Sequence, residues 1–99
     1  MQRGGCTYIL TNAHHTVFYT GVTSNLYNRI YKHKHHLYKN SFTDRYKIEV
    51  LVYYEGFFSI EEAITREKVI KKWNRQKKID LINSFNPEWK DLWEEISKW

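Results

Sequence analysis

Two short segments near the N-terminus are rich in β-branched and aromatic residues and are joined by a polar stretch. Cys6–Thr11 and Thr16–Thr20 favour strands, and the residues between them suit a hairpin loop. Gly21 is predicted to break the second strand. A third strand is predicted over Lys47–Glu55, because its nearly continuous apolar run is typical of a strand covered on both faces. Gly56 is expected to end it.

Four helices are predicted in the other segments. Ser24 or Asn25 can supply the N-cap of the first. Ser59 and Glu62 have the spacing of a capping box, in which each side chain binds a free backbone N–H of the opening turn. Pro87 interrupts the helical pattern and suits the first turn of a last helix. The predicted ranges are 25 to about 39, 60 to about 74, Lys77–Ser84 and Pro87–Trp99.

The resulting order is β-β-α-β-α-α-α, which predicts an α+β fold with a small sheet packed by helices. A length of 99 residues fits one domain, so residues 1–99 are expected to form a single unit. A chain this short needs a dense core, and an aromatic content of 17% can supply one.

The charge balance indicates which class of partner the chain could bind. The chain has 16 Lys and Arg against 11 Asp and Glu, which favours a polyanion, although a basic protein without such a partner fits equally well. The single cysteine, Cys6, excludes an intramolecular disulfide and a cysteine-based zinc site. No apolar run approaches the ~20 residues of a membrane span, and no signal peptide is visible, so a cytoplasmic protein without a membrane partner is expected.

Candidate chemistry begins with the hairpin and the helix that follows it. If the hairpin turns at its midpoint, Tyr8 lies directly opposite Tyr19, either as two functional phenols or as an ordinary cross-strand aromatic pair. Arg29 and His33 are four residues apart and share a helical face. Guanidinium and imidazole groups together suit a phosphate, whereas flanking lysines leave a solvated basic face as the alternative.

An acidic residue interrupts the apolar stripe of the second long helix. Glu67 lies three residues after Ile64 and four after Ala63, on the face expected to meet the core. A carboxylate there needs a partner. A divalent cation is one candidate, because magnesium is commonly held by one or two carboxylates with water and substrate phosphate. A local ion pair with Lys71 explains the pattern equally well.

Taken together, these residues resemble the GIY-YIG nuclease superfamily, most closely its small stand-alone bacterial members. Cys6-Thr7-Tyr8 stands at the first family signature and Tyr19-Thr20-Gly21 at the second, although Cys6 and Thr7 replace the glycine and isoleucine of the family name. Arg29 resembles the catalytic arginine, and His33 resembles the histidine one turn later. Glu67 resembles the metal-binding glutamate, and Asn86, followed by Pro87, resembles the terminal motif.

The resemblance covers residues 6 to about 92. It implies a three-stranded antiparallel sheet flanked by helices and a metal-dependent endonuclease that hydrolyses phosphodiester bonds in DNA, in repair or recombination. Mg²⁺ or Mn²⁺ would bind Glu67. A catalytically weak nucleic-acid-binding module of the same fold is the alternative. The catalytic residues that the resemblance implies are Tyr8, Tyr19, Arg29, His33 and Asn86.

A dense basic run near the end of the second long helix is a candidate surface for the DNA backbone, with RNA as another possible partner. Such residues contact phosphates without reading sequence. Trp73 lies within the run; an exposed ring there could stack on a base, but its spacing from Ile70 favours the core. The basic residues are Lys68, Lys71, Lys72, Arg75, Lys77 and Lys78.

Overall fold

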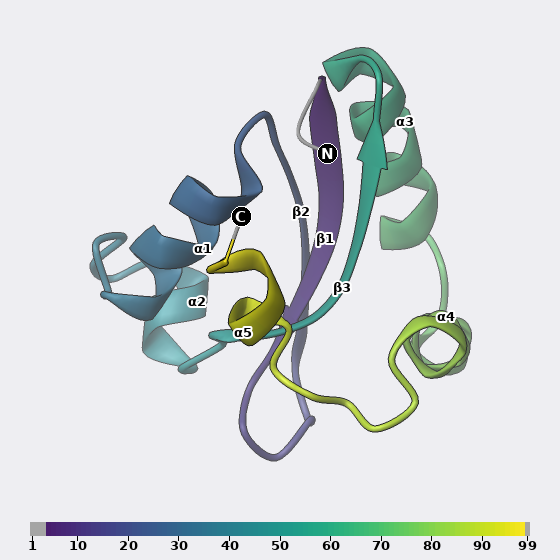
Figure 1. The fold of residues 1–99 in the computed structure, drawn as a ribbon. Coiled ribbons are helices and arrows are strands. Elements are labelled where there is room, and N and C mark those ends of the chain that lie inside the picture. The colour runs from purple at the N-terminus through teal and green to yellow at the C-terminus, as the bar shows by residue number, and fades with distance from the viewer. Residues whose placement is uncertain (1–3, 99) are drawn as a thin grey trace.

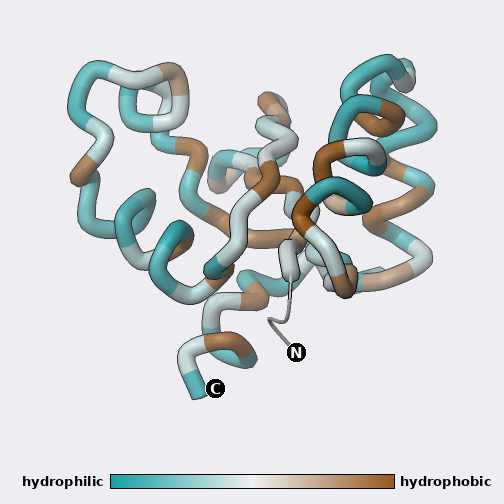
Figure 2. Tube along the Cα trace, turned by 90° about the horizontal axis from the view of Figure 1, so that it is seen from above, coloured by the Kyte–Doolittle hydropathy of each residue, from teal (hydrophilic) through white to brown (hydrophobic). Residues whose placement is uncertain are grey.

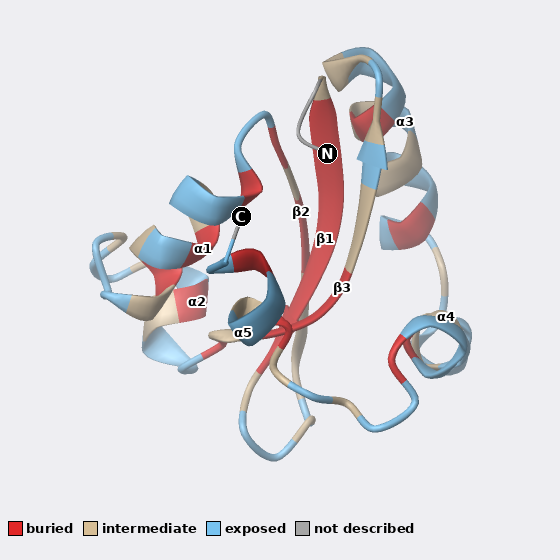
Figure 3. Ribbon diagram, viewed as in Figure 1, coloured by how far each residue is buried: buried red, intermediate tan, exposed pale blue. Residues whose placement is uncertain are grey.

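A three-stranded antiparallel sheet lies at the centre of the molecule. The structure is a computed structural model and describes residues 4–98. β1 (Gly5–Thr11) lies between β2 (Phe18–Thr23) and β3 (Val50–Phe57), as Figure 1 shows. Every residue of β1 is buried, which is why this strand is red throughout in Figure 3. The predicted α+β class and antiparallel sheet are confirmed.

Helices cover both faces of the sheet. α1 (Leu26–Lys34), α2 (Phe42–Arg45) and α5 (Trp93–Ile96) lie on one side, and α3 (Ile60–Lys71) and α4 (Arg75–Phe85) lie on the other (Figure 1). Within residues 4–98, none of these helices has the length and apolar character needed to cross a membrane.

Alternation along β1 divides the interior into two cores. Successive side chains of a strand point to opposite faces, so Tyr8 and Ile9 enter different layers. Figure 2 shows hydrophobic positions gathered toward the middle of the molecule and hydrophilic ones along the outer segments. The first core includes Tyr8, Leu10, Leu26, Ile30 and Ile96, and the second includes Ile9, Val52, Ile70 and Ile82.

The predicted register of the hairpin is wrong by two residues. Tyr8 pairs with Gly21, and Leu10 pairs with Tyr19. The loop is longer than predicted, because Asn12 Oδ1 accepts hydrogen bonds from the backbone N–H groups of Thr16 (2.8 Å) and Val17 (3.3 Å). A shift of two residues preserves the face. Tyr8 and Tyr19 are therefore diagonal neighbours on the same face, with ring centroids 6.3 Å apart.

The segment after α1 differs most from the prediction. Asn25 caps α1 as expected, but the helix ends at Lys34 rather than near Lys39. His36 and Asn40 have φ values of 56° and 64°, which do not continue a right-handed helix. The short helix α2 was not predicted, and Ser41 caps it by accepting a hydrogen bond from the backbone of Asp44.

β3 starts and ends later than the sequence indicates. Lys47 has a φ of 54° and lies outside the strand, which begins at Val50. Gly56 does not end the strand: it pairs with Cys6, and β3 continues to Phe57. The predicted capping box between Ser59 and Glu62 opens α3 as expected.

The C-terminal region contains less helix than predicted. α3 ends at Lys71 because Asn74 caps a separate helix, α4, which is slightly longer than the predicted Lys77–Ser84. The predicted helix Pro87–Trp99 is wrong for most of its length, since only Trp93–Ile96 is helical. Trp89 has a φ of 53°, which breaks a right-handed helix there. Trp99 lies outside the described residues.

Candidate active site

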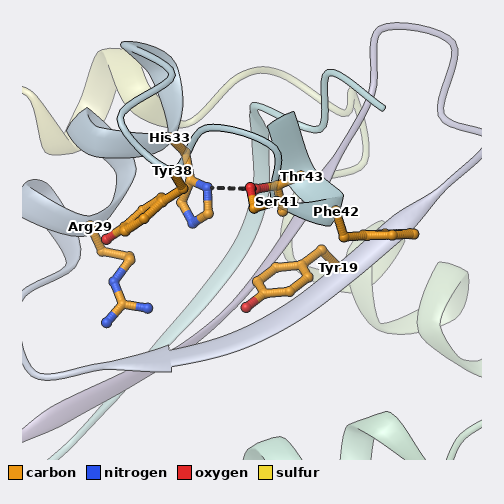
Figure 4. A pocket seen from close by; sticks show the side chains of 7 residues that line it. All are labelled: Tyr19, Arg29, His33, Tyr38, Ser41, Phe42 and Thr43. Carbon is orange, nitrogen blue, oxygen red and sulfur yellow. Dashed lines mark hydrogen bonds between the residues drawn. The ribbon is translucent and has the colours of Figure 1, made fainter. Parts of the chain in front are cut away.

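A pocket on the α1 side of the sheet contains three of the predicted catalytic residues. Tyr19 comes from β2, and Arg29 and His33 come from α1. Figure 4 shows the Tyr19 hydroxyl and the Arg29 guanidinium projecting toward the same space. The cavity measures about 280 Å³ and is lined by Tyr19, Arg29, His33, Tyr38, Ser41, Phe42 and Thr43.

Four of these lining residues were not identified from the sequence. Tyr38 lies in the last part of the helix predicted to run to about Lys39, and Ser41, Phe42 and Thr43 lie in the segment before the third strand, for which no element was predicted. The spacing of Ser41 and Asp44 is a usable signal, because serine three residues before an acidic residue is a helix-start pattern. It would have indicated α2, but not its position over the pocket.

Tyr8 lies beside the pocket and is fully buried. Its ring centroid lies 6.3 Å from that of His33, and its hydroxyl is buried next to the Arg29 guanidinium. Burial, followed by the neighbouring Tyr19 phenol, raises the pKa of Tyr8 far above its ordinary value, and the Arg29 charge opposes only part of this shift. Tyr8 is therefore a neutral phenol at pH 7 and can donate a hydrogen bond.

Arg29 supplies an uncommitted positive charge. Its side chain is half-buried, and its Cζ lies 5.8 Å from the ring centroid of Tyr38. Within residues 4–98, Arg29 forms no salt bridge with a carboxylate, in contrast to Arg66, which pairs with Glu55 at 3.2 Å. A partly desolvated guanidinium without a carboxylate partner is well suited to bind an anion such as a phosphate.

His33 is held by one ring nitrogen. Its Nδ1 lies 3.1 Å from Thr43 Oγ1, which lies 3.1 Å from Ser41 Oγ. The other nitrogen, Nε2, is buried and has no partner among the described residues. Burial, followed by the nearby Arg29 charge, lowers the pKa of His33 to about 4, so the imidazole is neutral at pH 7. The contact with the Thr43 hydroxyl holds the ring in place, and Nε2 is the ring nitrogen without a partner among the described residues.

This burial predicts a pH-dependent stability. The folded pKa of about 4 lies below the ordinary 6.5, so between these values the unfolded chain binds a proton that the folded chain does not. The free energy of unfolding should therefore fall as the pH decreases from about 6.5 to about 4. At pH 4.5, proton binding to His33 in the unfolded chain lowers the free energy of unfolding by about 2–3 kcal/mol relative to pH 7. Urea unfolding at pH 7 and pH 4.5 measures it.

The control for this prediction is His33→Phe, which keeps a buried ring but cannot be protonated. Carboxylates titrate in both proteins, so the difference between their pH dependences isolates the histidine. An identical loss of stability in wild type and His33→Phe would contradict a depressed His33 pKa.

Glu67 does not line the pocket. α3 covers the opposite sheet face, because Thr7, the neighbour of Tyr8, donates a hydrogen bond from its hydroxyl to the Ala63 carbonyl at 2.7 Å. The Glu67 side chain is only 13% exposed, and its Oε2 lies 2.7 Å from Lys71 Nζ. The local ion pair that the sequence allowed is therefore present.

The surroundings of Glu67 remain compatible with a cation bound mainly by water and phosphate. Within residues 4–98 there is no cluster of three or more His, Cys, Asp or Glu side chains that could hold a metal ion alone. Magnesium often needs only one or two carboxylates when a substrate phosphate completes its shell. The competing Lys71 side chain is 54% exposed, whereas the Glu67 carboxylate is only 13% exposed.

Asn86 forms hydrogen bonds with backbone groups and does not line the pocket on the α1 side. It is buried, and its Nδ2 donates hydrogen bonds to the carbonyl groups of Val52 (3.2 Å) and Lys90 (2.9 Å). Its Oδ1 accepts a hydrogen bond from the Lys90 backbone N–H at 3.1 Å. These bonds hold the turn after α4 against β3, so the geometry favours a structural role for Asn86.

Several basic residues of the predicted DNA-binding surface already contact other groups of the protein. Arg75 donates hydrogen bonds to the carbonyl groups of His15 and Thr16, both at 3.0 Å, and so fixes the hairpin loop. Lys77 Nζ lies 4.6 Å from the ring centroid of Trp73, which packs against the second core as the sequence favoured. Lys71 pairs with Glu67. The other residues predicted to contact the DNA backbone are Lys68, Lys72 and Lys78.

Comparison with known proteins gives one match. A family model described as the GIY-YIG catalytic domain matches residues 4–80. This range includes Tyr8, Tyr19, Arg29, His33 and Glu67, and it ends before Asn86. No significant match was found among curated proteins or among solved structures.

Proposed function

The chain belongs to the GIY-YIG family of nucleases, and we propose that its pocket on the α1 side of the sheet is the active site of a metal-dependent DNA endonuclease. Nuclease-type activity on DNA follows from the family. The endonucleolytic reaction at this pocket, the use of Mg²⁺ or Mn²⁺ and a role in repair or recombination form the proposal. The convergence of Tyr19, Arg29 and His33 beside Tyr8 is the observation that carries it.

Arg29 is the group that meets the scissile phosphate. Its charge is not neutralised by a carboxylate among the described residues, and it is close enough to Tyr8 to counter the rise in that phenol's pKa. A fixed guanidinium in a partly water-excluded pocket stabilises the extra negative charge of the transition state. Tyr8, being neutral, donates a hydrogen bond from its hydroxyl to an oxygen of the same phosphate.

His33 accepts the proton of the attacking water, and Tyr19 orients this water. When His33 Nδ1–H donates to Thr43, the lone pair of Nε2 is free to accept a proton, and the lowered pKa keeps this nitrogen unprotonated at pH 7. The raised pKa of Tyr8 disfavours it as a base in the free enzyme. Tyr19, which also lines the pocket, orients the water through its hydroxyl.

Glu67 is the proposed metal ligand. The family resemblance implies that a cation held here would stabilise charge on the leaving oxygen; because Glu67 does not line the pocket that contains Arg29 and Tyr19, this role rests on the resemblance and not on the geometry of the pocket. Binding would require Glu67 to exchange its ion pair with Lys71 for the cation. Lys68, Lys72 and Lys78 are proposed to contact the DNA backbone away from the pocket, without sequence preference.

Cleavage assays with matched glutamate variants test this proposal. Branched, nicked and linear DNA are incubated with Mg²⁺ or Mn²⁺ and with wild type, Glu67→Gln or Glu61→Gln. Glu61 is an exposed carboxylate on the same helix and serves as the control. We expect metal-dependent cleavage by wild type and Glu61→Gln, and loss of cleavage by Glu67→Gln.

Two other outcomes have definite meanings. Equal activity of wild type and Glu67→Gln would refute the metal role of Glu67. DNA binding without cleavage under any condition would favour the second candidate, a catalytically weak binding module. That candidate is supported by one observation, namely that Glu67 pairs with Lys71 and does not line the pocket.

A further inference from the structure

Phe42 is an exposed aromatic residue that lines the pocket, and a second exposed ring, that of Tyr46, lies beside it. We infer that Phe42 and Tyr46 form a stacking platform for one unpaired nucleobase next to the scissile phosphate. The substrate would then be DNA that is unpaired at the cleavage site, such as a bulge, a flap or a junction. This inference rests on the proposed function and names its substrate class.

The two rings form a continuous surface. Phe42 and Tyr46 are four residues apart around α2 and so lie on one side of it. Their ring centroids are 4.9 Å apart, and the residues are 49% and 53% exposed. Large aromatic side chains usually bury most of their area. Two such rings left half in water side by side indicate a surface that becomes covered by a ligand.

The platform is fixed relative to the site. Phe42 itself lines the pocket together with Tyr19 and Arg29, as Figure 4 shows. The next residue, Thr43, is buried and lies within hydrogen-bonding distance of His33. A nucleotide whose phosphate binds Arg29 would therefore carry its sugar and base toward this platform rather than into the sheet.

The basic residues around the platform favour nucleic acid as its ligand. Lys39, Arg45 and Lys47 flank α2, are exposed, and form no salt bridge among the described residues. Aromatic rings interleaved with free basic groups are typical of surfaces that bind single strands, where bases stack and phosphates are neutralised. The nearby carboxylates of Asp44 and Glu49 both contact His36, at 2.9 and 3.4 Å.

The base on this platform must be unpaired. In a continuous duplex both faces of each base are covered by its neighbours, so no face is available to a protein ring. An unpaired or extruded base can place one face on Phe42 or Tyr46. The platform therefore discriminates by strand structure and tolerates different bases, because every base has a π-face.

Binding to 2-aminopurine-labelled DNA in EDTA tests the inference without cleavage. The fluorescent base is placed either in a bulge or within a continuous duplex. We expect wild type to quench the bulged probe and to bind bulged DNA more tightly. The double variant Phe42→Leu, Tyr46→Leu keeps apolar side chains but removes the rings. It should lose the quenching and weaken binding to bulged DNA by about 5–100-fold, with no change for the duplex.

Two further variants separate stacking from general effects. Phe58→Leu removes an aromatic side chain that is 84% exposed and does not line the pocket, so it should behave as wild type. Phe42→Trp should retain quenching and the preference for the bulge. Equal weakening on bulged and duplex DNA, an equal loss in Phe58→Leu, or no quenching by wild type would each overturn the inference.

The nuclease proposal is judged independently. Quenching and bulge preference without any metal-dependent cleavage would leave the platform standing and count against the endonuclease. Metal-dependent cleavage that is equally fast on bulged and duplex DNA, in wild type and the double variant, would count against the platform alone.

Discussion

Replacement of Arg29 by alanine should reduce the rate constant for DNA cleavage by about 10²–10³-fold, the size of effect seen when one preorganised transition-state donor is removed. Stability should change little, because Arg29 forms no salt bridge among the described residues. Arg29→Lys should recover part of the rate, since lysine keeps the charge but lacks the planar pair of N–H donors. Single-turnover cleavage with enzyme in excess measures the chemical step.

Arg66→Ala is the matched control for this experiment. Arg66 is also half-buried, but it pairs with Glu55 and lies on the helix that covers the other face of the sheet. It should cleave at close to the wild-type rate. A second readout is the pKa of His33 by NMR, which should rise in Arg29→Ala because the Arg29 charge helps to lower it. Wild-type cleavage by Arg29→Ala would exclude the pocket as the active site.

Gly21→Ala should lower the free energy of unfolding by about 1–3 kcal/mol, as expected for an extra methyl group in a packed site. A Cβ at this position would lie 2.5 Å from the Tyr8 Cζ and Oη atoms and 3.0 Å from Tyr19 Cε2. The φ angle of Gly21 is not positive, so the cost comes from space rather than backbone strain. Because Tyr8 is fully buried, its ring cannot move away freely, and cleavage should fall as both phenols are displaced.

A double-mutant cycle identifies the cause. Tyr8→Leu shortens the side chain that the new methyl group would meet, so Gly21→Ala should cost much less stability in that background. Urea unfolding of the four proteins gives the coupling free energy. Strictly additive losses would show that Gly21 is not required for the packing of the Tyr8 ring.

Several local features of the structure follow from local physics, and their geometry was predicted correctly. Arg29 and His33 share the pocket because residues four apart lie on one side of any helix. The capping box at Ser59 depends only on hydrogen bonds within one turn. Tyr8 and Tyr19 share a face although the predicted register is wrong, because strand side chains alternate with a period of two and the error was two residues.

Other parts depend on contacts between distant residues. The predicted role of Asn86 was drawn from a motif, whereas its hydrogen bond to the Val52 carbonyl belongs to a backbone group 34 positions away. A continued helix after Lys34 was a reasonable prediction from polar residues with no strong break. The hydrogen-bonding contact between His33 and Thr43 instead accompanies a turn back over the sheet, which places Phe42 at the pocket.

By itself, the sequence determined the class of fold, the two tyrosines on one face and the Arg29–His33 pair, because each is set by the period of a strand or helix. The tertiary structure alone decided that α2 lines the pocket, that Glu67 lies outside it and that Tyr8 is desolvated. These outcomes depend on which surfaces pack together and exclude water, and no local pattern along the chain contains that information.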